Sequence, residues 1–200
     1  AGHQFYVQNF GCRATQADGA GIAAALAAKG LLQMDTPSAA ELVIVNTCTV
    51  TAEADQDARQ TIRRIHRENP KARILVTGCY AQRRPAELAE LPGVRWVVGN
   101  SHKTAIADVV APTLVNISPG AEPPEPPYHG EIAVGQILVG DIRDQKEFLS
   151  YPVTAAGRDR TRPNLKIQEG CDNRCTFCII PSVRGNSRSA RPEQVIGQVG

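Results

Sequence analysis

Hydrophobic and polar residues follow a repeating strand-then-helix pattern at the start of the chain. Residues 5–10 form a short run with aromatic and β-branched side chains, and an Ala-rich stretch at 17–29 follows it. This stretch ends at Gly30, a residue typical of helix C-termini. Residues 42–45 are an apolar run of the kind expected for a strand buried on both faces.

The same alternation continues to Val110. Thr51 can cap a helix that ends near Asn69, just before Pro70. Ser101 can cap a last helix, which reaches Val110. The other predicted elements are strands at 74–76 and 94–98 and a short helix at 85–91. Strands separated by helices of this length predict an α/β fold, with an open parallel sheet flanked by helices.

The character of the sequence changes after this region. Six of the fourteen prolines lie within residues 112–127, which predicts a semi-rigid, extended linker. Beyond it, residues 131–139 alternate like a strand, residues 165–168 form another strand, and Pro192 opens a helix. We therefore predict a first domain at 1–111, a Pro-rich linker at 112–130 and the start of a second domain at 131–200.

The composition is that of an ordinary globular protein. Hydrophobic residues make up 42% and charged residues 21% of the 200, which excludes disorder across the whole chain. No run approaches the roughly 18 apolar residues of a membrane-spanning helix, and the start lacks a signal sequence. We expect a cytoplasmic monomer without a membrane partner, and the net charge of +2 indicates no partner by itself. The chain begins without Met and stops within a new element, so we expect it to be a piece of a longer protein.

Three of the six cysteines follow directly on predicted strands. They are Cys12, Cys48 and Cys79, with 35 and 30 residues between them, a spacing unlike any compact metal motif. Because the strand C-termini of an open parallel sheet share one edge, where ligands bind, we expect these thiols to converge there. The alternative is three unrelated buried cysteines, since burial is common for this residue.

The other three cysteines, Cys171, Cys175 and Cys178, form a compact CxxxCxxC loop after a strand. Disulfides are one alternative, disfavoured by the lack of a signal sequence and by the strain of pairing such close thiols. Zinc is a second, but a structural zinc site takes four ligands and each set offers three. Three thiolates suit an iron–sulfur cluster with one iron left open for substrate, so two sets suggest two clusters.

The residues around the six cysteines form specific motifs. They are Gly-Cys at Cys12, Asn-Thr-Cys at Cys48, Gly-Cys at Cys79 and Gly-Cys-Asp-Asn-Arg-Cys-Thr-Phe-Cys-Ile-Ile-Pro from Gly170. Together they resemble the radical SAM methylthiotransferases over nearly the whole chain. Residues 46–51, 77–82 and 184–189 resemble the branch that acts on threonylcarbamoyladenosine in tRNA. Alternatives are a sister enzyme for isopentenyladenosine in tRNA or a ribosomal-protein aspartate, and an iron–sulfur or scaffold module without turnover.

This resemblance implies two four-iron four-sulfur clusters and S-adenosylmethionine as cofactors. The CxxxCxxC loop would hold the cluster that binds S-adenosylmethionine, and the further cofactor-binding residues would be Phe177, Ile179 and Arg184. Phe177 would lie against the adenine; packing against the barrel is its alternative role. The three upstream cysteines would hold the cluster that carries the sulfur. Relatives have Asn where this chain has Thr15, whose hydroxyl is a shorter hydrogen-bonding group.

The same resemblance implies a radical reaction. One-electron reduction, from an electron-transfer protein, would cleave S-adenosylmethionine to a 5'-deoxyadenosyl radical that abstracts hydrogen from carbon 2 of the modified adenine. Relatives complete a partial α/β barrel and add an RNA-binding domain beyond the position of Gly200. We therefore expect that these 200 residues alone do not complete methylthiolation.

Basic residues favour the anticodon stem-loop of a tRNA as substrate. Arg59, Arg63 and Arg67 lie at helical spacing, which would place them on one face suited to phosphates. A solvated helix face explains them almost as well. The later arginines, at 184, 188 and 191, can pair with an anionic cluster or with the carboxylate of S-adenosylmethionine.

Overall fold

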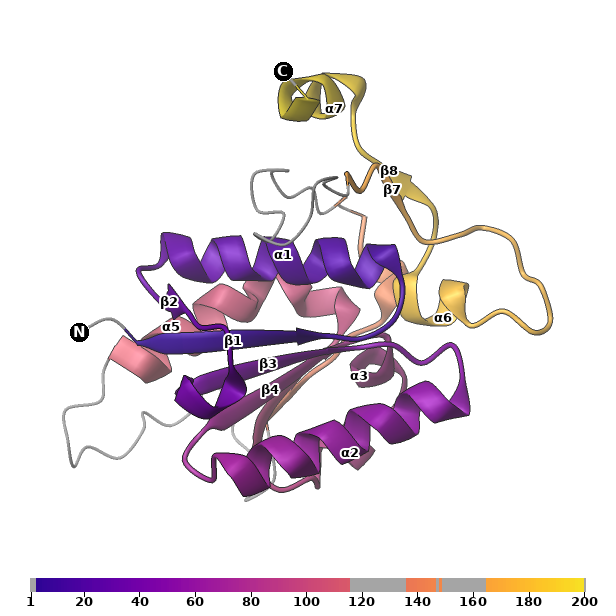
Figure 1. The fold of residues 1–200 in the computed structure, drawn as a ribbon. Helices are drawn as coiled ribbons and strands as arrows, with labels where there is room; N and C mark the ends of the chain where they lie inside the picture. Colours follow the sequence, from indigo (N-terminus) through magenta and orange to yellow (C-terminus); the bar gives the residue numbers. More distant parts are fainter. Residues whose placement is uncertain (1–2, 116–135, 147, 149–164, 200) are drawn as a thin grey trace.

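A six-stranded parallel sheet forms the centre of the molecule (Figure 1). The structure is a computed structural model, and it describes residues 3–115, 136–146, 148 and 165–199. The strands stand in the order β2-β1-β3-β4-β5-β6, and each neighbouring pair is parallel. Their bounds are β1 (Gln4–Asn9), β2 (Leu32–Gln33), β3 (Leu42–Thr47), β4 (Arg73–Gly78), β5 (Val94–Val98) and β6 (Gln136–Leu138). The predicted α/β fold with an open parallel sheet is confirmed.

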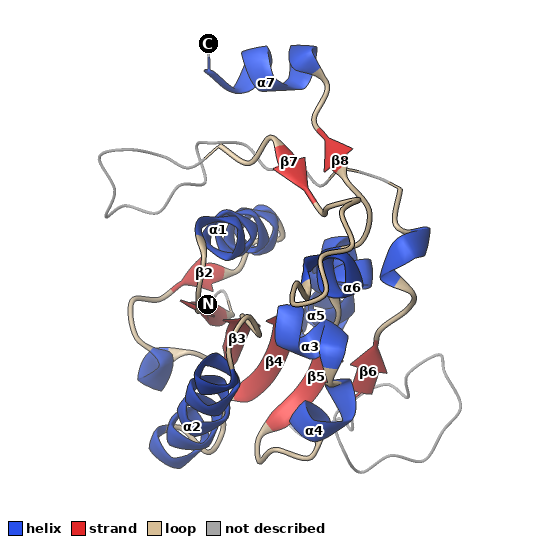
Figure 2. Cartoon of the chain, turned by 90° about the vertical axis from the view of Figure 1, so that its right-hand side faces the viewer, coloured by secondary structure: helices blue, strands red, loops and turns tan. Residues whose placement is uncertain are grey.

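Helices cover both faces of this sheet (Figures 1 and 2). The helices are α1 (Arg13–Ala28), α2 (Ala52–Glu68), α3 (Cys79–Arg83), α4 (Pro85–Ala89), α5 (Ile106–Val115), α6 (Ile180–Arg184) and α7 (Pro192–Val199). Three short 3₁₀ helices, η1 (Pro37–Ala39), η2 (Asn100–Ala105) and η3 (Ile142–Asp144), complete the set in the described ranges. Helices α1 and α5 pack on one face, and α2, α3 and α4 pack on the other.

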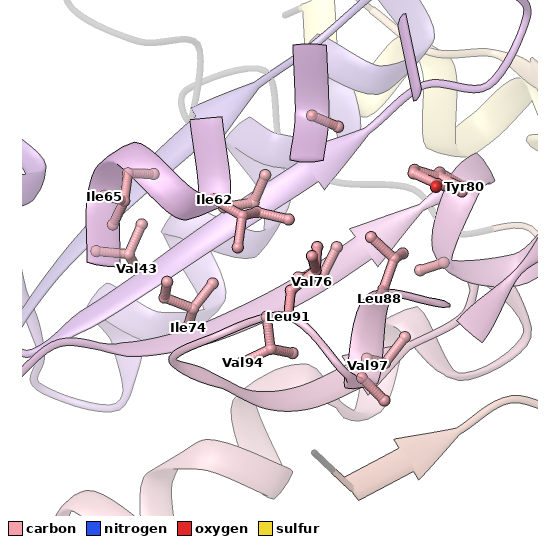
Figure 3. Packing of buried hydrophobic residues seen from close by; sticks show 14 of the residues in the cluster. Val43, Ile62, Ile65, Ile74, Val76, Tyr80, Leu88, Leu91, Val94 and Val97 are labelled. Carbon is pink, nitrogen blue, oxygen red and sulfur yellow. The ribbon is translucent and has the colours of Figure 1, made fainter. Parts of the chain in front are cut away.

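The side chains of the central strands alternate between two cores. In β3, Val43 and Val45 pack on the side of α2, together with Ile62 (Figure 3). Leu42 and Ile44 point to the opposite side and pack with α1 and α5. All six residues of β3 are buried, as the unbroken apolar run predicted.

The direction in which successive strands are added to the sheet reverses between β1 and β3. The helix that follows β1 lies on one face of the sheet, and the helix that follows β3 lies on the other. Such a reversal opens a crevice at the carboxyl ends of the two strands, where open α/β sheets bind ligands. Cys12 follows β1 and Cys48 follows β3, so both lie at this crevice.

The region around α5 differs from the sequence prediction. The 3₁₀ helix η2 precedes α5, and no side chain caps it, so the predicted cap at Ser101 was wrong. The Ser101 hydroxyl instead accepts a hydrogen bond from the amide of Gly140, at 2.9 Å. The helix itself continues past Val110 to Val115.

The predicted linker and second domain are only partly described. Residues 116–130 of the linker and 131–135 of the strand-like segment lie outside the described residues. The three residues of β6 pair with β5, so this part of the predicted second domain adds an edge strand to the first sheet.

Residues 165–199 form a smaller unit against the carboxyl end of the sheet (Figure 2). Strands β7 (Gln168–Glu169) and β8 (Arg188–Ser189) form a two-stranded antiparallel sheet, with α6 between them in sequence. The predicted strand at 165–168 is shorter and ends one residue later than expected. Pro192 opens α7 as predicted, and this helix projects away from the sheet. The opening of an α/β barrel stays a prediction.

Candidate functional site

The three upstream cysteines lie at the carboxyl ends of three adjacent strands. Cys48 follows β3 directly and Cys79 follows β4 directly, while Cys12 comes three residues after β1. Cys48 and Cys79 are buried, with 1% and 2% of their surface exposed, and Cys12 is exposed. The structure therefore brings the three thiols to the same edge of the sheet, as the strand pattern predicted.

A glycine beside the first cysteine permits this convergence. Gly11 has a positive φ of 82°, which L side chains rarely adopt. A Cβ on Gly11 would lie 2.5 Å from Cβ and 2.7 Å from Sγ of Cys48. The backbone of the β1–α1 loop thus packs directly on the Cys48 side chain, which only glycine allows.

The Cys12 thiol lies at the N-terminus of α1, where it occupies the N-cap position. Its sulfur is 3.6 Å from the hydroxyl of Thr15. Burial raises the pKa of this thiol, but hydrogen bonds from the backbone and side chain of Thr15, the charge of Arg184 and the amide of Ala14 lower it more. The net shift is downward, so the thiolate, which is the form that binds metal, is favoured.

Arg184, the last residue of α6, connects the second cysteine set to the first. Its guanidinium donates to the Thr15 hydroxyl at 3.4 Å, and its positive charge interacts electrostatically with Cys79. It is also paired with Asp18 and Glu169 and is only 4% exposed. Burial lowers the pKa of Arg184, but Asp18, Cys79 and Glu169 raise it more, so it stays charged. These protein partners occupy much of the guanidinium, and its predicted role in binding S-adenosylmethionine stays a prediction.

The CxxxCxxC loop surrounds a cavity. Cys171, Cys175 and Cys178 all line a cavity of about 660 Å³. The loop is closed at its base, because the amide of Cys171 donates to the carbonyl of Gly185 at 3.1 Å and the amide of Ser187 donates to Asp172 at 2.9 Å. The three loop cysteines thus line a common cavity, and their role as cluster ligands stays a prediction.

A second cavity, of about 570 Å³, separates the loop from α2 and α3. Phe177 and Ile179 line one side of it, and the Phe177 side chain is 92% exposed. The other side carries three arginines, at positions 59, 83 and 84. Two carboxylates balance part of this charge, since Arg83 is 3.4 Å from Asp55 and Arg84 is 2.6 Å from Glu87. An exposed aromatic ring thus faces a basic wall.

The three arginines that were predicted to share one face of α2 have different environments in the structure. Arg59 turns toward this second cavity, where its guanidinium donates to the Tyr80 hydroxyl. The Tyr80 hydroxyl in turn donates to Glu87, at 2.8 Å. Arg63 and Arg67 are exposed on the outer side of α2. Of the three arginines of the predicted basic face, only Arg63 and Arg67 are therefore exposed to solvent.

Several polar residues at the site were missed by the sequence analysis. Asp18 in α1, Lys103 in η2 and Glu169 in β7 are buried and charged. Asn100 is buried beside Cys79, with its amide nitrogen 3.7 Å from the sulfur and 2.7 Å from the carbonyl oxygen of Val183. A charged residue inside an apolar helix stretch, such as Asp18 within the Ala-rich α1, was the one available signal.

The chemistry of both donor sets fits an iron–sulfur cluster. Each set offers three soft thiol ligands, one set beside a buried guanidinium and the other around a cavity. Within the described ranges, no three His, Cys, Asp or Glu side chains are arranged around the position of a single metal ion.

Known proteins with similar sequences carry related names. Residues 4–99 match the family described as "Uncharacterized protein family UPF0004". The threonylcarbamoyladenosine tRNA methylthiotransferase MtaB of Aquifex aeolicus is 36% identical over 96% of the chain and 43% of its own length. Its namesake in Bacillus subtilis is 41% identical over 84% of the chain and 34% of its own length. The chain thus spans less than half the length of these curated relatives.

A solved structure shares the fold. It is the radical S-adenosylmethionine methyltransferase TsrM from Kitasatospora setae, described with cobalamin and a [4Fe-4S] cluster bound. The likeness has a TM-score of 0.58 at 16% identity and covers 99% of this chain and 46% of that chain.

Across the part of the chain that the structure describes, no helix is both long and apolar enough to cross a membrane.

Proposed function

Because the chain belongs to the radical SAM methylthiotransferase family, we propose that the protein containing it adds a methylthio group to a tRNA nucleoside. The nucleoside we propose is N6-threonylcarbamoyladenosine next to the anticodon, methylthiolated at carbon 2. The names of the two relatives support this substrate. The motifs after Cys48 and Cys79 support the same branch.

One observation carries this proposal: Arg184 connects the two sets of three thiols. Arg184 donates to the Thr15 hydroxyl, which in turn lies beside the Cys12 sulfur, and its positive charge interacts electrostatically with Cys79. The same residue ends the helix that follows the CxxxCxxC loop. Clusters held by these two sets would suit a reaction in which a radical formed at one must meet sulfur held at the other.

The residues that would hold the cofactors follow from this placement. The upstream set, Cys12, Cys48 and Cys79, would hold one four-iron four-sulfur cluster, and the loop cysteines would hold the other. When bound, these groups supply the electron that cleaves S-adenosylmethionine and the iron that carries the sulfur. A reducing electron-transfer protein is the partner that this chemistry requires.

The protein's own residues would then position the substrates. The exposed ring of Phe177, with Ile179 beside it, offers an apolar surface for an adenine ring at the second cavity. The arginines of the opposite wall suit RNA phosphates, and the exposed Arg63 and Arg67 extend the positive charge along α2. Cys48 and Cys79 are buried at the sheet edge, whereas Cys12 is exposed there.

Nucleoside analysis of tRNA tests this function. A strain that lacks the full-length gene is complemented with the wild type, with Cys48→Ala or with Cys175→Ala, and its tRNA nucleosides are measured by mass spectrometry. We expect 2-methylthio-threonylcarbamoyladenosine only with the wild type, while unmethylthiolated threonylcarbamoyladenosine accumulates in the others. Loss of methylthiolated isopentenyladenosine instead, or of a modified ribosomal-protein aspartate, would assign the protein to a sister branch.

A further inference from the structure

The carboxylate of Asp18 holds three cations in a buried position. It accepts hydrogen bonds from the ammonium groups of Lys103 at 2.7 Å and Lys166 at 2.6 Å. The guanidinium of Arg184 donates to it at 3.1 Å. Asp18 is 0% exposed, and its partners lie 85, 148 and 166 residues away in sequence. One side chain of α1 thus joins η2, the segment before β7 and the end of α6.

A second carboxylate completes the group. Glu169 accepts from Lys166 at 2.9 Å and from Arg184 at 2.7 Å. The side chains of these five residues are at most 7% exposed. We call them the buried charge network: Asp18, Lys103, Lys166, Glu169 and Arg184.

The network carries an excess of positive charge on the side of the thiols. Three cations face two carboxylates, and Arg188 adds a further cation 3.9 Å from Glu169. Arg184 is the member that contacts Thr15, and its positive charge interacts electrostatically with Cys79. Anionic sulfur at the sheet edge would balance this excess, so the network and the upstream thiols are electrostatically complementary.

Stability alone does not explain such a network. Replacing buried ion pairs with apolar residues of similar volume is often neutral or stabilising, because burying charges costs much of what pairing them returns. Unlike an apolar contact, a hydrogen-bonded ion pair is directional, because each hydrogen bond fixes the relative position of two groups. The network is also the place where the segments on both sides of the CxxxCxxC loop meet the first sheet domain.

We propose that the buried charge network sets the position of the CxxxCxxC loop relative to the upstream thiols, with Asp18 as the positioning residue. Asp18 touches neither cysteine set and acts through Arg184 and Lys166. Its role in coupling the two sites rests on the proposed function, whereas its role in docking the loop segment does not.

The test uses the full-length protein and three variants. Asp18→Asn removes the shared carboxylate. Lys166→Met removes one cation and leaves two cations of the network, Lys103 and Arg184, facing its two carboxylates. Asp108→Asn is the matched control, since Asp108 is 72% exposed and pairs with Lys29 on the surface, at 2.9 Å. Iron content and circular dichroism report whether each variant is folded and loaded.

The first readout is amide hydrogen exchange of peptides covering residues 165–190. We expect faster exchange in Asp18→Asn and Lys166→Met, with unchanged exchange in β3 and β4 and in the Asp108→Asn control. Should Asp18→Asn fail to fold, Lys166→Met decides. Wild-type exchange in a folded Lys166→Met would overturn the docking role. This readout does not depend on any activity, so it separates failure of this inference from failure of the proposed function.

The second readout is the number of S-adenosylmethionine molecules cleaved per methylthio group transferred. Misplacing reacting groups by about an ångström can slow a reaction roughly a hundredfold. We therefore expect both network variants to keep cleavage but to raise this ratio by about ten- to a hundredfold. An unchanged ratio in a variant with faster exchange would show that the network only stabilises the segment, and the positioning role would fall.

Discussion

Gly11 shows how one missing Cβ fixes a ligand position. In Gly11→Ala, the new Cβ would meet Cys48, and the positive φ would be strained. We expect the free energy of unfolding to fall by about 1–3 kcal/mol and the iron bound at the upstream thiols to be lost. Denaturant unfolding and iron analysis measure the two effects.

Gly30→Ala is the control for that substitution. Gly30 also has a positive φ, of 85°, but nothing lies within 4 Å of its added Cβ. We expect a cost of about 1–2 kcal/mol from the backbone conformation alone, with no change in iron. Equal iron loss in both variants would contradict the packing role of Gly11.

Asp18 gives the chain an acid-sensitive stability. Burial raises the pKa of its carboxyl, but Lys103, Lys166 and Arg184 lower it more, so the folded-state pKa lies well below the ordinary 3.8. A depressed pKa contributes stability that is complete above the unfolded value and is lost as the pH falls below it. We therefore expect the urea midpoint of unfolding to decrease as the pH is lowered below about 4. This decrease should be steeper in the wild type than in Asp18→Asn. The Asp108→Asn control should keep the wild-type slope, and equal slopes in all three proteins would contradict the ion pairing.

At the level of elements, α2 is the helix whose ends both follow from local sequence. The Thr51 hydroxyl accepts a hydrogen bond from the amide of Ala54, at 3.2 Å, and the helix stops before Pro70. Acidic residues in its first turn and basic residues in its last turn complement the helix dipole. The cap was predictable because both partners lie within four residues of each other.

Replacing this cap tests its contribution. Thr51→Ala leaves an amide of the first turn without its partner, and we expect a loss of about 1 kcal/mol in the free energy of unfolding. Thr51→Ser keeps the hydroxyl and should stay close to the wild type. Urea denaturation of the three proteins provides the comparison, and a serine variant as weak as the alanine variant would show that the methyl group, not the cap, matters.

Other elements could not be read from local sequence. The short edge strands β2 and β6 hold two and three residues, too few for an alternating pattern. The start of α1 was missed because Cys12 occupies the N-cap position without a side-chain cap hydrogen bond. The start of α5 was missed because Ser101, a good cap by type, bonds to Gly140, which is far away in sequence. Tertiary contacts decided these boundaries.

At the level of the whole molecule, the sequence predicted one half of the site and missed the other. Convergence of the upstream thiols follows from topology alone, since parallel strands end at a common edge. The bonds of Asp18 in the buried charge network join residues 85 to 166 positions apart, and no local pattern marks such pairs. Arg184 was noticed for its charge, but its partners, and therefore its role, required the structure.

The arrangement of two thiol sets leads to a prediction for the intact protein. If each set of three thiols holds one four-iron cluster, as we propose, the anaerobically reconstituted full-length protein should hold about eight irons. Replacing the upstream cysteines with Ala should remove about four of them and keep cleavage of S-adenosylmethionine, because the loop that would bind it stays intact. Replacing Cys171, Cys175 and Cys178 should also remove about four but abolish cleavage. Iron and cleavage unchanged in the upstream variant would mean that the three thiols at the sheet edge are ordinary buried cysteines.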